Sequence, residues 1–318
     1  MYGMISDVQL ACQASYGTSN VVSLTQIPVT KENLELKIGQ LLDPAMYGRY
    51  AESPRYAGPR TVAGQLDVVP MPAFLGKLLY GVCGSDSVTF AGSLATHRFR
   101  PLNTVDWDGN TALPPYSLLV NRDVGSAFLY FDLAMNDLNL DFANGQLLKA
   151  TLGLIGGKYA DASKVAPVFP AEKEWTWDTF SASYGGQGLS VRKGSIKLVN
   201  NLETIFLLGN SLYPAYIKRK GPVQVTGQLT LQFNANSLMG DFFTQSQPGR
   251  QLLLNFFSSV QGSASLLVDL PQTRLMAWKP YITGPGALEV PVDLVGEYNT
   301  TSSYQLQYTV TNTVAAYP

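Results

Sequence analysis

Charged residues are scarce in this sequence. Asp, Glu, Lys and Arg make up 14% of its 318 residues, against about 25% in a typical soluble domain. The 22 Lys and Arg residues against 23 Asp and Glu residues leave a net charge of -1. Tight binding of nucleic acid requires clustered Lys and Arg side chains, so the composition excludes a nucleic-acid binder. A surface with so little net charge also gives little protection against self-association.

Histidine and cysteine are nearly absent as well. Cys12 and Cys83 are too few for a disulfide framework or a structural zinc site, and we expect them to be buried free thiols of a chain made in a reducing cytoplasm. His97 is the only histidine, and no HExxH, GxSxG, P-loop or CxxC pattern occurs. The sequence therefore predicts no catalytic residue, no metal site and no cofactor, and His97 is interpreted as a hydrogen-bonded structural residue.

Signals for secretion and for the membrane are also missing. Met1–Leu10 lacks the basic start and the apolar run of a signal peptide. Three long uncharged segments are too rich in Gln, Asn, Ser, Thr and Gly to be membrane spans, and we expect no membrane contact. Because interface cores are depleted in charge, these segments are candidates for subunit contacts: Val8–Thr30, Gln251–Val268 and Tyr298–Pro318.

Four short motifs carry weak chemical signals, and each has a simpler structural interpretation. Asp106–Asn110 lacks the third ligand and the distal Glu of a calcium loop and is interpreted as a tight turn. Asp137 and Asp141 could mimic a glycosidase pair but are interpreted as turn or loop acids. Gly185–Gly188 has no strand-to-helix frame for a dinucleotide, and Lys218–Lys220 is interpreted as a solvated loop.

An internal repeat organises the chain. Gly58–Leu66 (GPRTVAGQL) and Gly221–Leu229 (GPVQVTGQL) are identical at six of nine positions, at an offset of 163 residues. Three weaker matches occur in the same order in both halves, and we interpret the whole series as a duplication. They pair Leu34–Ile38 with Ile196–Val199, Ser117–Val120 with Ser265–Val268, and Leu148–Gly156 with Leu288–Gly296.

Apolar and polar residues alternate through the repeated segments. From Val223 to Phe233 the odd positions hold apolar residues or Gly and the even positions hold Gln or Thr, the pattern of a strand with one buried face. Tyr304–Thr311 repeats this pattern. Only Pro72–Val82 and Ser237–Phe243 have helical patterns, and each follows the GQL strand of its copy. The sequence predicts an all-β fold with one short helix per unit.

The repeat divides the chain into five parts. We expect two tandem related units, each a small β-sandwich or barrel, joined by a linker whose second half is flexible. The parts are an N-terminal arm (1–30), unit one (31–160), the linker (161–190), unit two (191–300) and a C-terminal segment (301–318).

Taken together, these residues resemble the tail tube proteins (major tail proteins) of long-tailed bacteriophages, in their duplicated-domain form. The resemblance begins at Ala14–Thr18 (ASYGT), which is similar to a TYGT element of that family, and continues through the strand containing Gly64–Leu66 and its helix. Thr96 and His97 ahead of an aromatic residue, and Ile196–Glu203 (IKLVNNLE), extend it. The motifs are short, and their order and duplication carry the resemblance over nearly the whole chain.

The resemblance implies a structural role in the virion tail. Tail tube proteins form six-fold rings that stack into a hollow tube, a passive conduit for genome ejection. A duplicated chain implies a ring of three chains with pseudo-six-fold symmetry, and a ring of six chains stays open. The implied partners are sister subunits, the terminator, the distal tail protein and the tape measure, with DNA passing without specific binding. Assembly would take place in the cytoplasm of the bacterial host.

The resemblance also suggests residues for the two kinds of surface that a tube needs. The candidate acids of the lumen are Asp132, Asp137 and Asp141. The candidate contacts within and between rings are Tyr16, Trp175, Trp177, Tyr304, Leu306 and Tyr308.

Two other functions stay open at this point. Another ring-forming virion protein, such as a terminator, baseplate or decoration subunit, would form a single ring that does not stack. A carbohydrate-binding β module would use exposed aromatic side chains to stack on sugars, and the tryptophans suggest it: Trp107, Trp175, Trp177 and Trp278.

Overall fold

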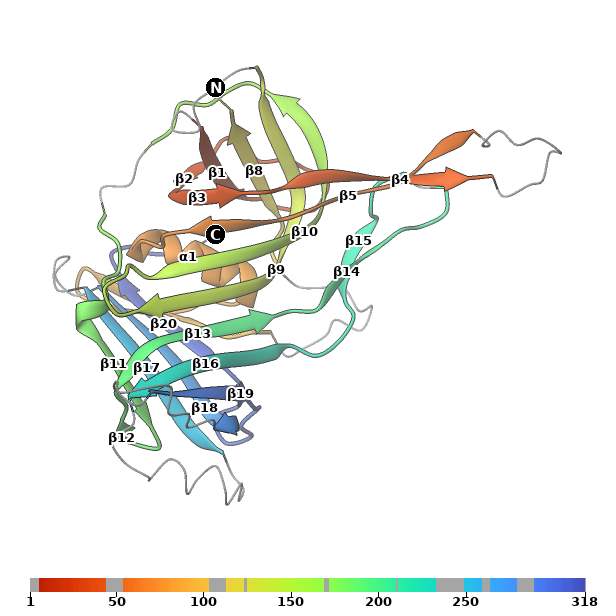
Figure 1. The fold of residues 1–318 in the computed structure, drawn as a ribbon. Coiled ribbons are helices and arrows are strands. Elements are labelled where there is room, and N and C mark those ends of the chain that lie inside the picture. The colour runs from red at the N-terminus through yellow and green to blue at the C-terminus, as the bar shows by residue number, and fades with distance from the viewer. Residues whose placement is uncertain are drawn as a thin grey trace.

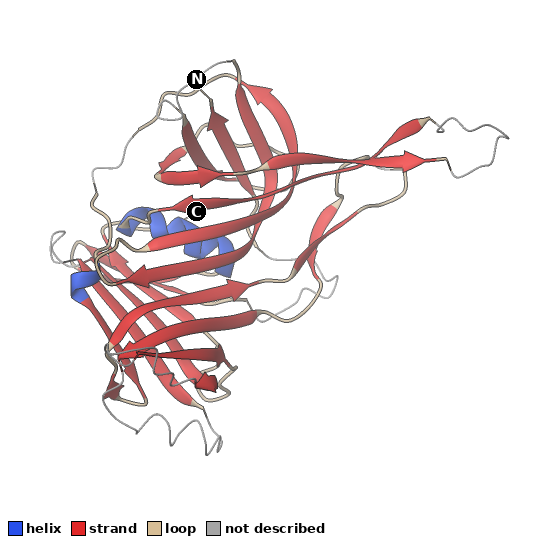
Figure 2. Ribbon diagram, viewed as in Figure 1, coloured by secondary structure: helices blue, strands red, loops and turns tan. Residues whose placement is uncertain are grey.

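Antiparallel β-strands make up most of the described structure, which confirms the predicted all-β fold (Figure 2). Most strands of the first half form the upper part in Figure 1 and most strands of the second half form the lower part, with helix α1 near their meeting point and β14 and β15 rising toward β4 and β5. The computed structural model describes residues 6–43, 54–102, 113–122, 125–168, 172–209, 211–232, 249–258, 264–278 and 289–317.

A curved sheet contains most of the first half, and β9 is its central strand. β10 pairs with β9 on one side and leads through β5 to β3 and β4 at the edge. β8 pairs with the first part of β9 on the other side and leads through β1 to β2. The bounds are β1 (Asp7–Cys12), β2 (Thr25–Ile27), β3 (Val29–Glu32), β4 (Glu35–Leu42), β5 (Arg55–Val68), β8 (Tyr116–Asn121), β9 (Ala127–Ala143) and β10 (Lys149–Ala162).

A second curved sheet is built around β18. On one side, β17 pairs with β18 and leads through β11 to β12. On the other side, β19 leads through β16 to β13, while β20 pairs with the first part of β18. The bounds are β11 (Phe180–Tyr184), β12 (Gln187–Gly188), β13 (Val191–Val199), β16 (Gln224–Gln232), β17 (Arg250–Ser258), β18 (Ala264–Trp278), β19 (Glu289–Gly296) and β20 (Gln307–Asn312).

The two sheets are joined edge to edge by β9 and β13. Asn136 is a β-bulge, because Met135 lies opposite Leu154 while Asp137 lies opposite Gly153. Beyond this bulge, β9 no longer pairs with β8 and instead pairs with β13 over residues 137–143. At the bulge, the side-chain oxygen of Asn136 accepts a 2.8 Å hydrogen bond from the Leu202 N–H. This hydrogen bond holds the turn after β13.

Two short hairpins complete the strands. β6 (Ser87–Ala91) pairs with β7 (Leu94–Phe99), and β7 pairs with β20, so residues of the first half extend the second sheet. β14 (Leu202–Ile205) and β15 (Tyr216–Arg219) form a separate hairpin that continues β13 and β16 beyond the sheet.

Corresponding strands of the two halves pair in the same register. Leu66 of β5 lies opposite Leu152 of β10. The residue 163 positions after Leu66 is Leu229 of β16, and it lies opposite Val292 of β19, 140 positions after Leu152. The strand pairs β5–β10 and β16–β19 therefore have the same register, although the two strands of the pair repeat at different offsets, 163 and 140 residues.

The irregularities of the two sheets correspond as well. The bulge at Asn136 of β9 recurs at Met276 of β18, again 140 residues later. A register shift lies between Tyr116 and Leu118 of β8 where that strand pairs with β9, and β17 has its own shift against β18 between Arg250 and Leu252. The repeat was found from identical amino acids, whereas a bulge is a feature of backbone geometry. The recurrence of the bulges is therefore a separate observation that supports the same correspondence between strands.

One of the predicted matches is wrong. Ser117–Val120 lies in β8, whereas Ser265–Val268 lies in β18, which takes the place of β9 in the second sheet. By its pairing, β8 corresponds to β17. Both segments have the sequence Ser-Leu-Leu-Val because both are buried strands of similar composition. A match of four residues does not distinguish similar composition from common origin.

Helix α1 (Pro72–Cys83) confirms the helix predicted over Pro72–Val82. Pro72 at its start supplies a fixed helical φ, and Gly84 ends it at φ 79°. The Glu172 carboxylate accepts a hydrogen bond from the Ala73 N–H at 2.7 Å, which places a negative charge at the positive end of the helix. Nine of the twelve helical residues are buried, so α1 fills the core between the strands.

Three further predictions concern a second helix, the linker and the N-terminal arm. The second predicted helix, Ser237–Phe243, lies outside the described residues. The second half of the linker, predicted to be flexible, instead forms β11 and β12, which pair with the second sheet through β17. Residues 7–12 of the predicted N-terminal arm form β1 of the first sheet.

Candidate assembly surfaces

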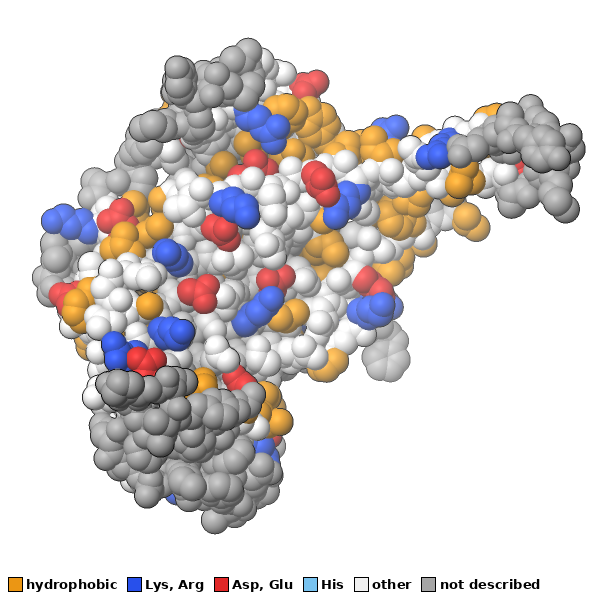
Figure 3. All heavy atoms as spheres, viewed as in Figure 1, with side chains coloured by type: hydrophobic (Ala, Val, Ile, Leu, Met, Phe, Trp, Pro, Cys, Tyr) orange, Lys and Arg blue, Asp and Glu red, His pale blue; other side chains and the backbone are white. Residues whose placement is uncertain are grey.

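A polar face extends across β5, β10, β9, β13 and β16 on the side away from the core. Residues at alternate positions of β9 are buried, such as Leu138 and Leu140, and those between them are half-exposed. Figure 3 shows acidic and basic side chains interspersed with neutral polar atoms over these strands. An open depression of about 440 Å³, lined by five strands, follows this face.

Several acids on the polar face and on the neighbouring strand β19 have partners within the chain. Asp137 Oδ1 lies 3.5 Å from the Lys197 ammonium, and Asn139 donates a 2.6 Å hydrogen bond to Asp141. On neighbouring strands, Gln228 donates to Asp293 at 2.7 Å. These acids and the neutral polar groups between them offer hydrogen bonds to water, and Lys197 lies beside Asp137 rather than alone.

Asp137 and Asp141, two of the three predicted lumen acids, lie together on this face. Both belong to the strand β9, so their interpretation as turn or loop acids is wrong. They have opposite neighbours on β10 and β13 rather than a shared substrate-sized cleft.

Asp132, the third predicted lumen acid, has a different role. Its backbone has a φ of 59° and only 7% of the residue is exposed. Its carboxylate accepts hydrogen bonds from Gly17 N–H at 2.7 Å and Gln13 Nε2 at 3.2 Å, and pairs with Lys158 at 3.0 Å. Asp132 therefore anchors the N-terminal segment to β9 and offers no free carboxylate to a lumen.

An apolar surface lies on a protruding hairpin. The hairpin is the outer part of β4 and β5 and extends far from the rest of the chain (Figure 1). Its apolar side chains are all more than half exposed, where Figure 3 shows hydrophobic atoms along the projection. They are Ile38, Leu41, Leu42 and Tyr56.

A second apolar segment lies against this hairpin. The Arg60 N–H donates a 2.7 Å hydrogen bond to the Leu212 carbonyl, and the Arg60 guanidinium lies 5.8 Å from the Tyr213 ring centroid. The exposed apolar residues of the second segment connect β14 to β15: Phe206, Leu207, Leu208 and Leu212. Exposed apolar patches of this kind mark interaction sites. Sequence reasoning missed both segments, although the run Phe206–Leu208 between turn residues was a usable signal.

Three of the six predicted contact residues have no surface for another subunit. Trp175, Leu306 and Tyr308 are at most 1% exposed and pack in the main hydrophobic core. This corrects their prediction as contacts, because burying them within the chain stabilises the chain itself. It also removes Trp175 from any sugar-binding surface; Trp107 and the side chain of Trp278 lie outside the described part.

The other three predicted contact residues retain exposed surface. Tyr16 is 37% exposed and Trp177 is 50% exposed. Tyr304 is half-buried: its hydroxyl donates a 2.8 Å hydrogen bond to Asp269, and the Arg100 guanidinium lies over its ring. Burial and this hydrogen bond raise the pKa of Tyr304 to about 12. A role for these residues in subunit contacts stays a prediction.

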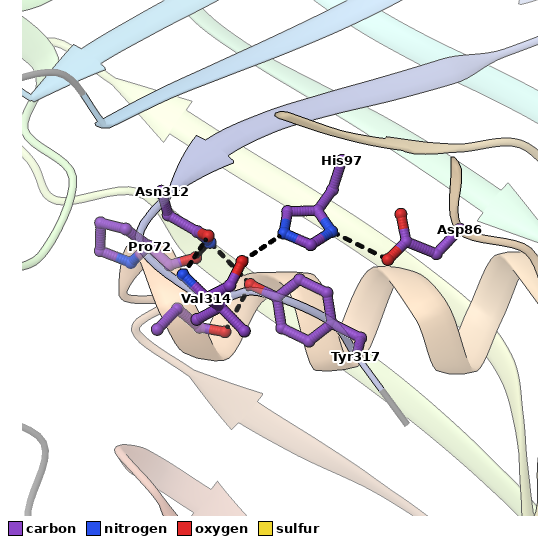
Figure 4. A network of polar contacts seen from close by, with 7 residues as sticks. Pro72, Asp86, His97, Asn312, Val314 and Tyr317 are labelled. Carbon is purple, nitrogen blue, oxygen red and sulfur yellow. Dashed lines mark hydrogen bonds and ion pairs between the residues drawn. The ribbon is translucent and has the colours of Figure 1, made fainter. Parts of the chain in front are cut away.

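A network of polar contacts holds the C-terminal segment on helix α1 (Figure 4). His97 is fully buried; its Nδ1 lies 2.8 Å from Asp86 Oδ2 and its Nε2 lies 2.8 Å from the Val314 carbonyl. Both ring nitrogens of His97 therefore have a polar partner. Asn312 Nδ2 donates to the Tyr317 hydroxyl at 2.6 Å and to the Pro72 carbonyl at 3.0 Å. His97 is thus a structural hydrogen-bonding residue, as the sequence predicts.

We expect Gly76→Ala to release the C-terminal segment. A Cβ at Gly76 would collide with the ring of Tyr317, whose hydroxyl donates to the Ala73 carbonyl at 3.0 Å. Overpacking of this kind costs about 1–3 kcal/mol, measured as a loss in free energy of unfolding in urea, together with faster carboxypeptidase digestion. Gly188→Ala is the control, because nothing lies within 4 Å of its added Cβ. Equal stability of the two variants would contradict the packing described.

The basic run Lys218–Lys220 is not the solvated loop that the sequence suggested. Its first two residues belong to β15, and Arg219 donates hydrogen bonds to the Leu102 carbonyl at 2.5 Å and to Asn200 Oδ1 at 2.9 Å. Burial lowers the pKa of the Arg219 guanidinium from its ordinary value. Arg219 therefore holds the β14–β15 hairpin against the first half of the chain.

Both cysteines are free, as predicted, and we expect slow thiol chemistry. Cys83 is fully buried, and burial raises the pKa of its thiol; burial also raises the pKa of the half-buried Cys12. Because the thiolate is the reacting form, a disulfide reagent at pH 7 should leave Cys83 unmodified and modify Cys12 more slowly than a free thiol. Urea should expose both. Rapid modification of Cys83 in a folded Cys12→Ser variant would refute this.

Two searches of the described residues bear on ligands and membranes. No group of three or more His, Cys, Asp or Glu residues there is arranged to hold a metal ion. Among the same residues, no helix is long and apolar enough to cross a membrane.

Comparison with known proteins adds a family. A family model described as "Phage tail tube protein" matches residues 6–296. No curated protein matches the chain. Among solved structures, the binding domain of botulinum neurotoxin DC in complex with rat synaptotagmin II is 9% identical, covers 95% of this chain and 98% of its own, and has a TM-score of 0.11. A likeness this weak carries no argument about fold or function.

Proposed function

Because the chain belongs to the phage tail tube protein family, as the match over residues 6–296 shows, we propose that three copies form a ring with pseudo-six-fold symmetry and that such rings stack into the tail tube. The structural role in the virion tail follows from the family. The ring of three chains, the stacking and the passage of DNA are the proposal.

The matching register of the two sheets carries this proposal. Strands β5, β10 and β9 have counterparts in β16, β19 and β18, with equal pairing and equivalent bulges at Asn136 and Met276. This supports a duplication in which each chain contributes two similar sheets to a ring. Three chains then supply the six sheets that six single-unit subunits supply in other tubes. The unit boundaries that fit the pairing are 7–162 and 180–312, which extend both predicted units.

The polar face supports a role as a conduit. Its acids are paired with Lys or amide side chains on the same face, so DNA would meet a hydrated wall of low net charge. Such a wall releases few counterions on contact with DNA and binds it weakly. We therefore infer that this face lines the lumen, with Asp137 and Asp141 among its residues.

The apolar protruding hairpin supports stacking. It extends away from the sheets and exposes four large apolar side chains, which an assembled tube would cover at the next ring. The terminator, the distal tail protein and the tape measure would meet the ends or the inside of such a tube. The free thiols are consistent with assembly in the host cytoplasm.

Electron microscopy of the purified protein tests the proposal. We expect hollow tubes in negative stain, and top views of short stacks whose averaged images show three-fold symmetry with six similar lobes. Discrete monomers over a range of protein concentration, salt and pH would refute the tube. A single closed ring that never stacks would instead favour a terminator or baseplate subunit.

A further inference from the structure

The pairing of β9 with β13 inside the chain indicates how neighbouring chains pair. Past the bulge at Asn136, the first opposed residues are Asp137 and Val199, followed by Leu138 and Leu198. We call these pairs the internal seam. Leu138 and Leu198 are both 0% exposed and belong to the main hydrophobic core.

The partner strand of the internal seam, β13, corresponds to β4 of the first unit. Leu198 of β13 lies opposite Val225, and Leu36 of β4 lies opposite Val62, which is the residue 163 positions before Val225. Leu36 is therefore the counterpart of Leu198. By the same pairing, Lys37 is the counterpart of Val199.

The other strand of the internal seam, β9, corresponds to β18 of the second unit. Beyond the equivalent bulge at Met276, Ala277 takes the place of Asp137 and the next position, 278, takes the place of Leu138. β18 thus carries its own continuation past the bulge, directed like the end of β9.

These counterparts are without a partner on the equivalent edge. Within the described residues, β4 pairs only with β5, and residues 277 and 278 pair only with β19. The Lys37 and Glu35 side chains on β4 are 59% and 64% exposed. An open strand edge with exposed backbone donors and acceptors is a template for pairing with another chain.

We propose that the end of β18 of one chain pairs with β4 of the next chain, in the antiparallel register of the internal seam. Ala277 then lies opposite Lys37, and residue 278 lies opposite Leu36. The inference rests on the proposed ring of three chains. In that ring three internal seams alternate with three seams between chains. Each chain has one edge of each kind, so the contact is head-to-tail, and it closes into a ring when three repeats of its rotation complete a full turn.

Cysteine cross-linking tests the register. The variant K37C/A277C is made in a background with Cys12→Ser and Cys83→Ala, assembled into tubes and oxidised. Opposed residues of an antiparallel pair have Cβ atoms about 4.5–5.5 Å apart, close to what a disulfide requires. On a denaturing gel without reductant we expect most of the protein in bands of two and three chains, and a ladder that ends at three.

The internal seam supplies a matched control. D137C/V199C joins the equivalent pair inside one chain and should form a disulfide without changing the number of chains in the band. E35C/A277C shifts the pair by two residues and should cross-link at least tenfold less. K37C alone should stay monomeric on the gel.

The outcomes separate the seam from the proposed function. Tubes that form normally while K37C/A277C gives no linked chains, or while E35C/A277C links more efficiently, would overturn the seam and leave the tube intact. A ladder that reaches six chains would support the seam and overturn the ring of three. Failure of the wild-type protein to form rings or tubes would overturn the proposed function itself.

Discussion

Replacing the four exposed apolar residues of the protruding hairpin by threonine is expected to abolish tubes while leaving folded chains and rings (I38T/L41T/L42T/Y56T). Each of these side chains is more than half exposed in the single chain, so its loss removes little from the core. Full burial of one such side chain at an interface is worth about 1.5–3 kcal/mol. A ring contains several copies of the hairpin, so the losses accumulate at every stacking step. Tube length in negative stain and sedimentation velocity measure the effect.

Threonine keeps the β-propensity of the strands, and a control on the same hairpin separates apolar contact from hairpin shape. Gln40 and Arg55 are exposed and joined by a 2.8 Å hydrogen bond. The variant Q40T/R55T removes this pair, which contributes at most about 1 kcal/mol, and should form tubes of normal length. Normal tubes from the fourfold apolar variant would show that the hairpin is not a stacking contact.

His97→Ala is expected to give the largest loss of stability of any single substitution in the C-terminal network. Asp86 would lose its hydrogen-bond partner on the imidazole; its side chain is 7% exposed, and its Oδ1 already lacks a hydrogen-bond partner. The Val314 carbonyl would lose its donor at the same time. Leaving a buried polar group without its hydrogen-bond partner costs about 1–3 kcal/mol, and two groups are affected here, so the loss is a large part of the stability of an ordinary domain. Urea unfolding followed by tryptophan fluorescence measures it.

A double variant tests whether the unpartnered Asp86 carboxyl group is the cause. H97Q/D86N replaces both side chains by amides, which can donate to and accept from each other. It should be clearly more stable than His97→Ala, because no unpaired carboxylate stays buried. A loss below about 1 kcal/mol for His97→Ala would contradict the described network.

The sequence predicts most of the strands and the helix because their signals are local. Alternation from Val223 to Phe233 requires a strand with one buried face, and β16 fills that range as far as Gln232. The apolar run after Met71 with Pro72 at its start gives α1. The repeated GQL strands also have the same register in the structure: Leu66 lies opposite Leu152, and its counterpart Leu229 lies opposite Val292.

Other features depend on contacts that periodicity does not contain. Alternation says which side chains share a face but not what covers it, so Trp175 in a proline-flanked segment is buried while Leu41 in a regular strand is exposed. Asp132 bonds to Gly17 across 115 residues, which no local pattern reports. The bulge at Asn136 decides which strand β9 pairs with, and a bulge has no single sequence signature.

The internal seam between β9 and β13 has a consequence for the kinetics of assembly. Half of the seams in a ring of three chains form inside single molecules, where the linker keeps the two sheets at a high effective concentration regardless of how much protein is present. In the proposed ring, two association steps between molecules then bring the three chains together, instead of five for six single-unit chains, and the last seam closes within the assembly. Ring formation should therefore depend less steeply on protein concentration and proceed while the protein is still dilute.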